Sequence, residues 1–207
     1  YLSLIALLAQ LLVSGRYGYF RDEFYYFACG EHLDWGYVDQ PPFVALAAYF
    51  VRHVLGESLL GIRFLPAICN ALVVFLSGLM ARALGGGRFA QGLAALATLT
   101  APVYLIIHHI FSMNCFDHVF WALAAYIVIR ILKEDRPRLW VLFGLVAGLG
   151  LVNKYSVGFL GMGLVVGLIF TPARKHLLSK WLWLGGVIAF LIFLPHILWQ
   201  IQHDFPT

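Results

Sequence analysis

The sequence has few charged residues for its length. Charged side chains make up 12% of the 207 residues, against about 25% in soluble domains, whereas hydrophobic residues reach 62%. A soluble fold of this length could not bury so much apolar surface, and a disordered chain requires low hydrophobicity. The composition therefore excludes both classes and indicates a polytopic integral membrane protein whose apolar excess faces lipid.

The sequence also lacks the cysteine spacing of metal or redox sites and the clusters of basic residues that bind nucleic acids. The three cysteines, Cys29, Cys69 and Cys115, form no CxxC pair and no zinc-like spacing, so we interpret them as packing residues. The net charge of +4 is small and no nucleic-acid-binding motif accompanies it, which excludes nucleic acid as a partner. The sequence starts without Met inside an apolar run and stops just after a proline. We therefore expect one membrane module, residues 1–207, truncated at both ends.

Apolar runs of near-spanning length recur along the chain, and they predict an all-α bundle of about seven membrane segments. Crossing the hydrocarbon core requires about 20 apolar residues. The expected segments are Tyr1–Ser14, Phe64–Leu84, Phe89–His108, Cys115–Leu132, Leu139–Val152, Tyr155–Thr171 and Trp181–Gln200. A polar and aromatic loop, about 15–63, lies between the first two and does not span.

The stretch 139–171 is too long for one span. Its 33 residues would make a helix about 50 Å long, whereas the hydrocarbon core is about 30 Å thick. Its middle is Asn153-Lys154, and a charge at mid-bilayer costs about 2.5–3.5 kcal/mol. Two short helices that meet at this dipeptide avoid the cost, and they place Lys154 near a membrane surface.

Loop charge supports the same division. The loops 82–88, 130–138 and 174–180 hold nine of the 14 basic residues, and the division puts all three on one side. The positive-inside rule makes that side cytoplasmic. Eight of the ten acidic residues and seven of the eight histidines then lie toward the other face, where we expect the chemistry.

The first outer loop is rich in aromatic residues, which suit the membrane–water interface. Its sequence predicts two interfacial helices, from Asp22 to about Leu33 and from about Pro42 to Leu55. The adjacent carboxylates of Asp22 and Glu23 diverge by about 100° on a helix, so one can face a reaction centre while the other braces the loop. The alternative is that Asp22 caps the helix and Glu23 favours its dipole.

Other polar residues near the outer face have functional and structural interpretations. Asp117-His118 falls at the start of an apolar helix, where an ionisable group is a functional candidate and an N-cap is the alternative. Lys154 is either a binding residue or a snorkelling lysine. His108-His109 fits an interfacial pair better than a metal site, because adjacent histidines diverge.

The order of several motifs resembles the GT-C membrane glycosyltransferases. This superfamily includes the protein O-mannosyltransferases, the lipid A aminoarabinose transferases and the RgtA/B/C/D-like bacterial enzymes. The motifs are Arg-Asp-Glu-Phe-Tyr-Tyr at 21–26, Gly-Tyr-Val-Asp-Gln-Pro-Pro at 36–42, Arg-Phe-Leu-Pro at 63–66, Ala-Arg-Ala-Leu-Gly at 81–85, Asp117, Asn-Lys-Tyr at 153–155 and the stretch from Pro195 to Pro206. Each motif is weak alone, but the resemblance covers essentially the whole sequence.

The resemblance implies transfer of a sugar from a polyprenyl-phosphate carrier to a lipid, glycan or protein acceptor at the extracytoplasmic face of a bacterial plasma membrane. The family's catalytic carboxylate falls on Asp22, and Glu23 matches the second acid. Asp39 matches an acidic residue before the proline. A lysine that holds the carrier phosphate in the aminoarabinose transferases is Gln40 here, which argues against that substrate.

These residues allow a consistent chemistry. Asp22 is expected as the general base, with Lys154 and either Gln40 or Arg63 near the phosphate. Asp117 would orient the sugar or the acceptor. His118 and Tyr155 complete the predicted substrate-binding set, and membrane lipids surround the site.

Two other functions compete with this interpretation. A transporter would place its site between inverted repeats, but the helix break at Asn153 has no counterpart elsewhere in the sequence. A metal-dependent transferase would hold a divalent ion through Asp22, Glu23 and Asp117, whereas the loop motif favours the branch without a cofactor.

Overall fold

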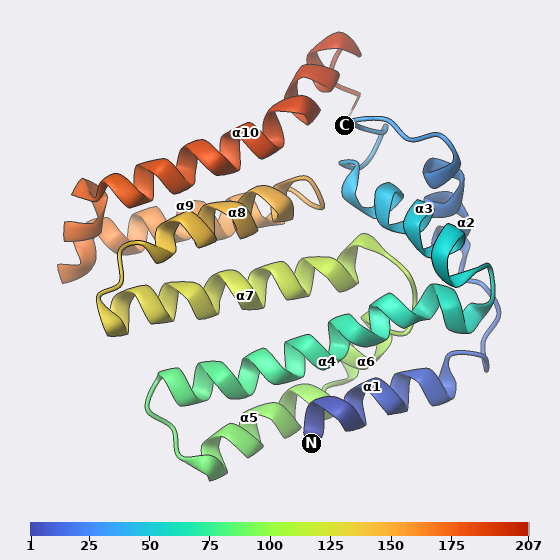
Figure 1. Ribbon diagram of the computed structural model, residues 1–207, viewed down its shortest axis with the longest axis horizontal. Coiled ribbons are helices and arrows are strands. Elements are labelled where there is room, and N and C mark those ends of the chain that lie inside the picture. Colours follow the sequence, from blue (N-terminus) through green and yellow to red (C-terminus); the bar gives the residue numbers. More distant parts are fainter. Residues whose placement is uncertain (207) are drawn as a thin grey trace. The chain divides into compact units, whose positions relative to one another are not determined.

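The computed structural model describes residues 1–206 and consists of helices joined by short connections (Figure 1). Within that range it contains no β-strand, which confirms the predicted all-α class. The elements are α1 (Leu2–Val13), α2 (Arg21–Glu31), α3 (Phe43–Leu55), α4 (Leu59–Ala83), α5 (Arg88–Thr100), α6 (Pro102–Ile107), α7 (Met113–Glu134), α8 (Leu139–Leu151), α9 (Ser156–Ile169), the 3-10 helix η1 (Pro172–Leu178) and α10 (Lys180–Gln202).

Three of these helices, α4, α7 and α10, are long and apolar enough to cross a membrane. The pair α9 and η1, bent by 114°, would make a fourth span. The apolar helices α1, α3 and α8 have 12, 13 and 13 residues and rise about 18–20 Å, less than a hydrocarbon core of about 30 Å. Length and composition thus support three or four candidate spans, and the number of about seven stays a prediction.

The predicted segment Phe89–His108 is two helices, so the continuous span expected there is wrong. α5 ends at Thr100, Ala101 is extended with ψ 121°, and α6 begins at Pro102. A proline disfavours the helical conformation in the residue before it, but its fixed φ suits the first position of a helix. Pro102 therefore ends one helix and opens the next.

The division at Asn153-Lys154 is confirmed. α8 ends at Leu151, and the backbone N–H groups of Asn153 and Lys154 both donate to the Gly150 carbonyl, at 3.0 and 2.8 Å. α9 then starts at Ser156. The two helices expected in the first loop are also present, as α2 and α3, with bounds within two residues of those predicted. Their position at the membrane interface stays a prediction.

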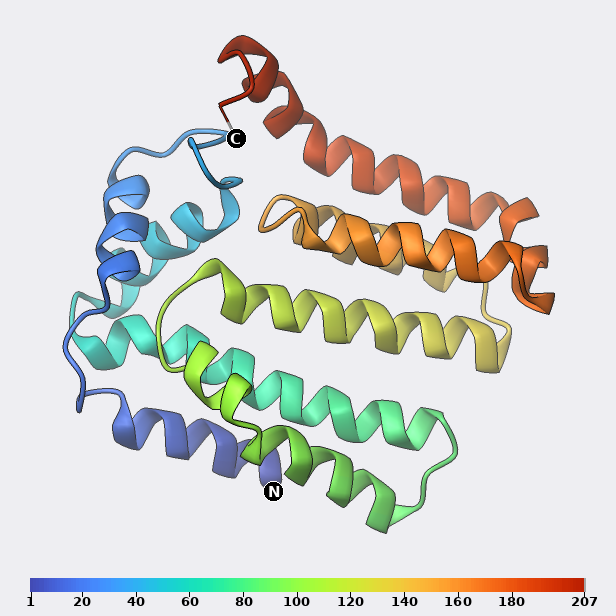
Figure 2. The same cartoon turned by 180° about the vertical axis from the view of Figure 1, so that it is seen from behind.

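The chain divides into two compact units, and the first comprises Tyr1–Asp34 with Pro42–Val119. In this unit α4 packs against α1 and α5, which lie alongside it (Figures 1 and 2). The contact is built on the buried side chains of Ala6, Val74 and Ala95. Small side chains let helix backbones approach closely, as in membrane bundles.

The second unit comprises Trp35–Pro41 and the chain from Phe120 onward. Its main contact is α8 against α10. Gly144 and Gly185 meet there: a Cβ on Gly144 would overlap the Gly185 backbone, and a Cβ on Gly185 would overlap the Trp140 carbonyl. The buried core beside this contact consists of Ala124, Ile127, Ile131, Trp140, Val146 and Leu168.

Basic loops gather at one end of this second unit. Lys175 Nζ lies 2.8 Å from Asp135 Oδ1, and the Arg138 guanidinium lies 5.8 Å from the centre of the Trp181 ring. The loops 130–138 and 174–180 therefore lie together, as the division of 139–171 requires. Since α8 runs from this end to Leu151, the Asn153-Lys154 turn lies at the other end.

We expect Gly144→Ala to lower the apparent melting temperature of the detergent-solubilised protein, because the added methyl group would force α8 away from α10. Alanine is a better helix former than glycine by about 1 kcal/mol, so helix propensity would act in the opposite direction. The matched control is Gly163→Ala in α9, where nothing lies within 4 Å of a Cβ. Equal melting temperatures for the two variants would contradict the proposed close contact.

Candidate functional site

The Glu23 side chain, in the first turn of α2, is fully buried and accepts hydrogen bonds at both oxygens. Oε2 accepts from the Phe20 backbone N–H at 2.7 Å and from Arg63 Nη2 at 3.1 Å. Oε1 accepts from the Phe111 backbone N–H at 2.8 Å and from Arg63 Nε at 3.3 Å. A carboxylate offers about four acceptor positions, so these four bonds engage Glu23 fully.

Arg63, near the start of α4, is 2% exposed and uses all five of its N–H donors within the first unit. Besides the two bonds to Glu23, Nη1 donates to the carbonyl oxygens of Ser14 and Tyr17, and Nη2 donates to that of Gly18 at 2.7 Å. These carbonyls belong to the connection between α1 and α2. The predicted phosphate contact by Arg63 does not fit this geometry, because no donor is left for a substrate.

We call the set of Glu23, Arg63 and the Phe111 amide the Glu23 clamp. It joins the start of α2, the start of α4 and the segment before α7. Burying two charges costs several kcal/mol per ion, and such a pair is stable only when further hydrogen bonds complete it. Here every acceptor position and every donor is used, so the clamp holds three segments of the chain in one geometry.

Asp22 precedes Glu23 and remains open to solvent. Its side chain is 42% exposed, and its Oδ1 lies 3.2 Å from Nε of Arg21, which is itself 90% exposed. The helix N-cap is Phe20, so the alternative in which Asp22 caps α2 is wrong, and Glu23 makes the capping contact instead. Because neighbouring helical residues diverge by about 100°, the clamped Glu23 directs Asp22 away from the buried side. Of the two predicted catalytic carboxylates, Asp22 is therefore the one exposed to solvent.

Asp117 and His118 lie in the second turn of α7, so the N-cap alternative for Asp117 is also wrong. Asp117 is 8% exposed, and the His118 ring centre lies 5.3 Å from that of His108. Burial lowers the pKa of His108 to about 4, so this ring is neutral at pH 7. α7 begins two residues after Phe111, whose backbone N–H donates to Glu23, so the clamp also anchors the start of α7.

In the second unit, hydrogen bonds from His196 hold the segment Trp35–Pro41. The His196 ring, 1% exposed, lies 2.8 Å through Nδ1 from the Trp35 carbonyl oxygen and 2.6 Å through Nε2 from the Tyr155 hydroxyl. Since a carbonyl can only accept, Nδ1 donates to Trp35, and in the neutral ring Nε2 accepts from Tyr155. Nε2 of Gln200 donates to the same hydroxyl at 3.4 Å.

A close contact with Trp199 adds to this attachment. Gly36 lies against the indole ring, and a Cβ at this position would overlap the ring. The segment Trp35–Pro41, the turn before α9 and the end of α10 therefore share one end of the second unit. It is the end opposite the basic loops.

The four predicted site residues of the second unit belong to the two segments joined in this way. Asp39 is exposed, Lys154 is half-buried and Tyr155 is 38% exposed. Gln40 is 1% exposed, and its carbonyl accepts from the Tyr37 N–H at 3.0 Å, which closes the turn. This burial suits support of the loop better than contact with a carrier phosphate, so Lys154 is the stronger candidate for that contact.

The residues of the metal site considered as an alternative are not gathered into a cluster in the described part of the chain. Among residues 1–206, no three His, Cys, Asp or Glu side chains are placed to hold a metal ion. Glu23, one of the three proposed ligands, has its acceptor positions occupied by the clamp.

Sequence reasoning missed His196 and Trp199, which organise the second unit's end. The signal was present, because a histidine inside an apolar spanning run is by default a functional candidate. Its partner Trp35 is 161 residues away along the chain, and no local pattern connects the two.

Comparisons with known proteins place these features in a family. The sequence profile described as dolichyl-phosphate-mannose-protein mannosyltransferase matches residues 39–199. Three curated relatives come from Rhizobium johnstonii. The lipid A galacturonosyltransferase RgtD is 26% identical over 190 residues, which cover 91% of this chain and 40% of the relative.

The other two relatives are lipopolysaccharide core galacturonosyltransferases. RgtB is 26% identical over 83% of this chain and 35% of its own length, and RgtA is 27% identical over 82% of this chain and 34% of its own length. The chain thus spans two fifths or less of these relatives. No solved structure matches it significantly.

We expect Glu23→Gln to lower the free energy of unfolding by about 3–5 kcal/mol, the usual effect of removing one partner of a buried ion pair. The matched control is Glu31→Gln on the same helix. Glu31 is 58% exposed and pairs with Arg52 at 2.6 Å, and exposed pairs contribute little. Chemical denaturation of the solubilised protein measures both effects. Similar losses in the two variants would show that the clamp adds nothing beyond a surface pair.

Proposed function

The chain belongs to the dolichyl-phosphate-mannose-protein mannosyltransferase family, and from this membership we propose that the complete protein moves a sugar from a polyprenyl-phosphate carrier to an acceptor hydroxyl. The family description itself names a sugar on a prenyl phosphate. The curated relatives are named for galacturonosyl transfer to lipid A and to lipopolysaccharide core, which supports a lipid or glycan acceptor. The acceptor site would involve parts of the protein outside this chain, because the relatives are much longer.

The observation that carries the proposal is that the solvent-exposed carboxylate of Asp22 lies next to the buried and fully hydrogen-bonded carboxylate of Glu23. Attack of a hydroxyl on the anomeric carbon requires a base, and a positioned carboxylate contributes about 10²–10⁴-fold in rate. Asp22 supplies that base, and the Glu23 clamp positions it without taking part in the chemistry. A base is useful only if its direction is fixed, which a buried and fully bonded neighbour provides.

The proposed step is a single displacement. The acceptor O–H gives its proton to the Asp22 carboxylate as its oxygen bonds to the anomeric carbon. The bond between that carbon and the phosphate oxygen breaks, and the carrier phosphate leaves with the electron pair. A fixed cation near the departing oxygen lowers the barrier, and Lys154 is the candidate because Arg63 is fully engaged in the clamp.

The remaining predicted residues take supporting roles in this proposal. Asp117 and His118 orient the sugar or the acceptor from the start of α7. Asp39 lines the donor site, while Gln40 and Tyr155 support the loop and the turn that carries Lys154. No metal ion or cofactor is required by this chemistry.

The proposed location of the reaction is the extracytoplasmic face of the plasma membrane. In the first unit, the clamp lies near the start of α4, whereas Arg82 lies in the last turn of that helix and Arg88 begins α5. In the second unit, Lys154 lies opposite the basic loops. The positive-inside rule then supports placing both Asp22 and Lys154 on the outer face.

We expect Asp22→Asn in the complete protein to reduce the rate of sugar transfer by about 10²–10⁴-fold, because the amide cannot accept the acceptor's proton. The partly exposed position of Asp22 predicts a folded variant with an unchanged melting temperature. Release of radiolabelled sugar from a polyprenyl-phosphate donor in membrane vesicles measures the rate.

Asp34→Asn is the matched control, since it removes an exposed carboxylate from the same loop without touching the proposed base. Transfer by Asp34→Asn should stay close to that of the unmodified protein. Undiminished transfer by a folded Asp22→Asn protein would reject Asp22 as the base.

A further inference from the structure

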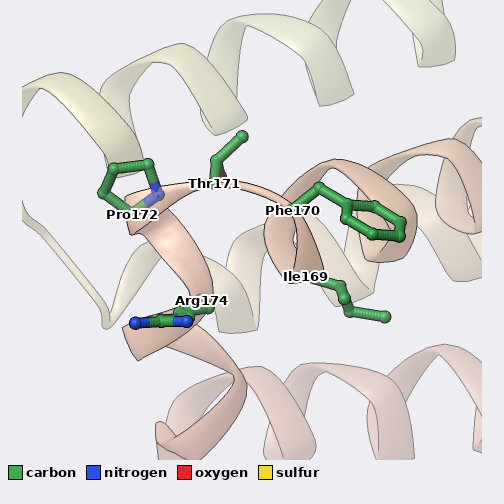
Figure 3. Close-up of a pocket in the computed structure, with 5 residues that line it drawn as sticks. All are labelled: Ile169, Phe170, Thr171, Pro172 and Arg174. Carbon is green, nitrogen blue, oxygen red and sulfur yellow. The ribbon is translucent and has the colours of Figure 1, made fainter.

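A cavity of about 470 Å³ lies where α9 turns into η1, at the basic end of the second unit. Its lining residues are Ile169, Phe170, Thr171, Pro172 and Arg174 (Figure 3). At this point η1 is bent by 114° from the line of α9. All five lining residues are exposed, so the cavity is an open hollow on the surface of this unit and not an enclosed site.

The lining of the cavity is divided by polarity. Figure 3 shows the Phe170 ring pointing toward the body of α9, while the Arg174 guanidinium points the other way, on the side of Pro172. Phe170 is 83% exposed and Ile169 is 49% exposed, so both offer apolar surface to an outside partner. A ligand that fills the cavity would meet hydrocarbon on one side and a cation on the other.

Positive charge exceeds negative charge throughout this end of the unit. The cations are Arg130, Lys133, Arg136, Arg138, Arg174, Lys175 and Lys180, and the carboxylates are Glu134 and Asp135. With His176 neutral, the excess is five positive charges. Glu134 is bound by Arg130 and Arg136, and Asp135 is bound by Lys175, so both carboxylates already have partners.

Arg174 is one of the cations at this end that form no ion pair with a carboxylate among residues 1–206, and it is the one that lines the cavity. Its backbone N–H donates to the Thr171 carbonyl at 3.0 Å, and no ion pair of its exposed guanidinium forms within residues 1–206. A guanidinium binds phosphate oxygens in a bidentate fashion and is weakly hydrated, which suits a site at a membrane surface.

One feature of the fold opposes an anion here. The cavity adjoins the C-terminal end of α9, which carries about half a negative elementary charge. Hydrogen bonds to the last carbonyls reduce this charge, since the Thr171 hydroxyl donates to Gly167 and the Phe170 N–H donates to Val166. The five excess positive charges outweigh what remains, so the cavity favours an anionic ligand.

The surroundings suit a membrane–water interface. Trp183 is 66% exposed, and its Nε1 donates to the Leu177 carbonyl at 3.0 Å, while Leu178 is 91% exposed. Tryptophan rings settle at the headgroup level of a bilayer. Both the arginine and the apolar residues of the cavity are therefore expected at the depth of lipid phosphates.

We propose that this cavity binds the headgroup of an anionic glycerophospholipid, with the phosphate diester on Arg174 and the first part of an acyl chain on Ile169 and Phe170. Charge complementarity selects an anionic lipid over a zwitterionic one, and the apolar side of the cavity selects a lipid over free phosphate. The site lies at the end of the second unit opposite Lys154, so it is distinct from the proposed transfer site and does not depend on it.

The test compares binding of phosphatidylglycerol and phosphatidylcholine with identical acyl chains to the complete protein in detergent, measured by native mass spectrometry. Phosphatidylglycerol should bind more tightly. Arg174→Gln should weaken it by about fivefold, the loss expected for one basic side chain at an anionic lipid surface. Arg174→Lys keeps the charge but loses the bidentate geometry, so it should weaken binding less than Arg174→Gln does, which separates lost charge from misfolding.

The matched control is Arg88→Gln, which removes an exposed arginine from the other basic turn and should leave phosphatidylglycerol binding unchanged. An equal loss in Arg88→Gln would show general attraction to negative charge and overturn the site. Equal binding of the two lipids would overturn it as well. Displacement of the lipid by glycerol phosphate alone, at matched concentration, would show a free-phosphate site and reject the lipid.

Discussion

The buried pair of Glu23 and Arg63 is the interaction on which the proposed chemistry depends. Two charges without water are stable only when all their hydrogen-bonding capacity is used, and here four acceptor positions and five donors are all occupied. That requirement fixes the connection before α2, the start of α4 and the Phe111 segment together. Asp22 obtains its direction from this arrangement, although it contributes nothing to it.

In the second unit, segments that are distant along the chain are also held together, but without a buried ion pair. His196 joins Trp35 to Tyr155, and Trp199 packs over Gly36, so a loop from the first third of the chain is held on the last helix. In both units the polar residues lie opposite the basic turns. The proposed location of the reaction follows from this arrangement within each unit, because the positive-inside rule predicts that the basic turns face the cytoplasm.

The sequence predicted the features that local chemistry controls. The two helices around a Pro-Pro stop and the break at Asn153-Lys154 follow from proline geometry, helix length and the cost of a buried charge. The break at Pro102 has a local cause as well, since the residue before a proline is restricted, but it lies in a continuous apolar run that resembles one span.

The different roles of Asp22 and Glu23 could not be predicted in the same way. Periodicity shows that adjacent carboxylates diverge, but only the fold shows which one meets Arg63 and the Phe111 amide, 40 and 88 residues away.

The most direct test of the account is to determine on which side of the membrane Asp22 and Lys154 lie. Cys29, Cys69 and Cys115 are first replaced by Ser. Asp22→Cys, Lys154→Cys and Arg136→Cys are then made one at a time in this background, and each variant is labelled with a membrane-impermeant maleimide in vesicles of both orientations. Cysteines at 22 and 154 should react in right-side-out vesicles and the one at 136 in inverted vesicles; labelling of 22 and 154 from opposite sides would contradict the account.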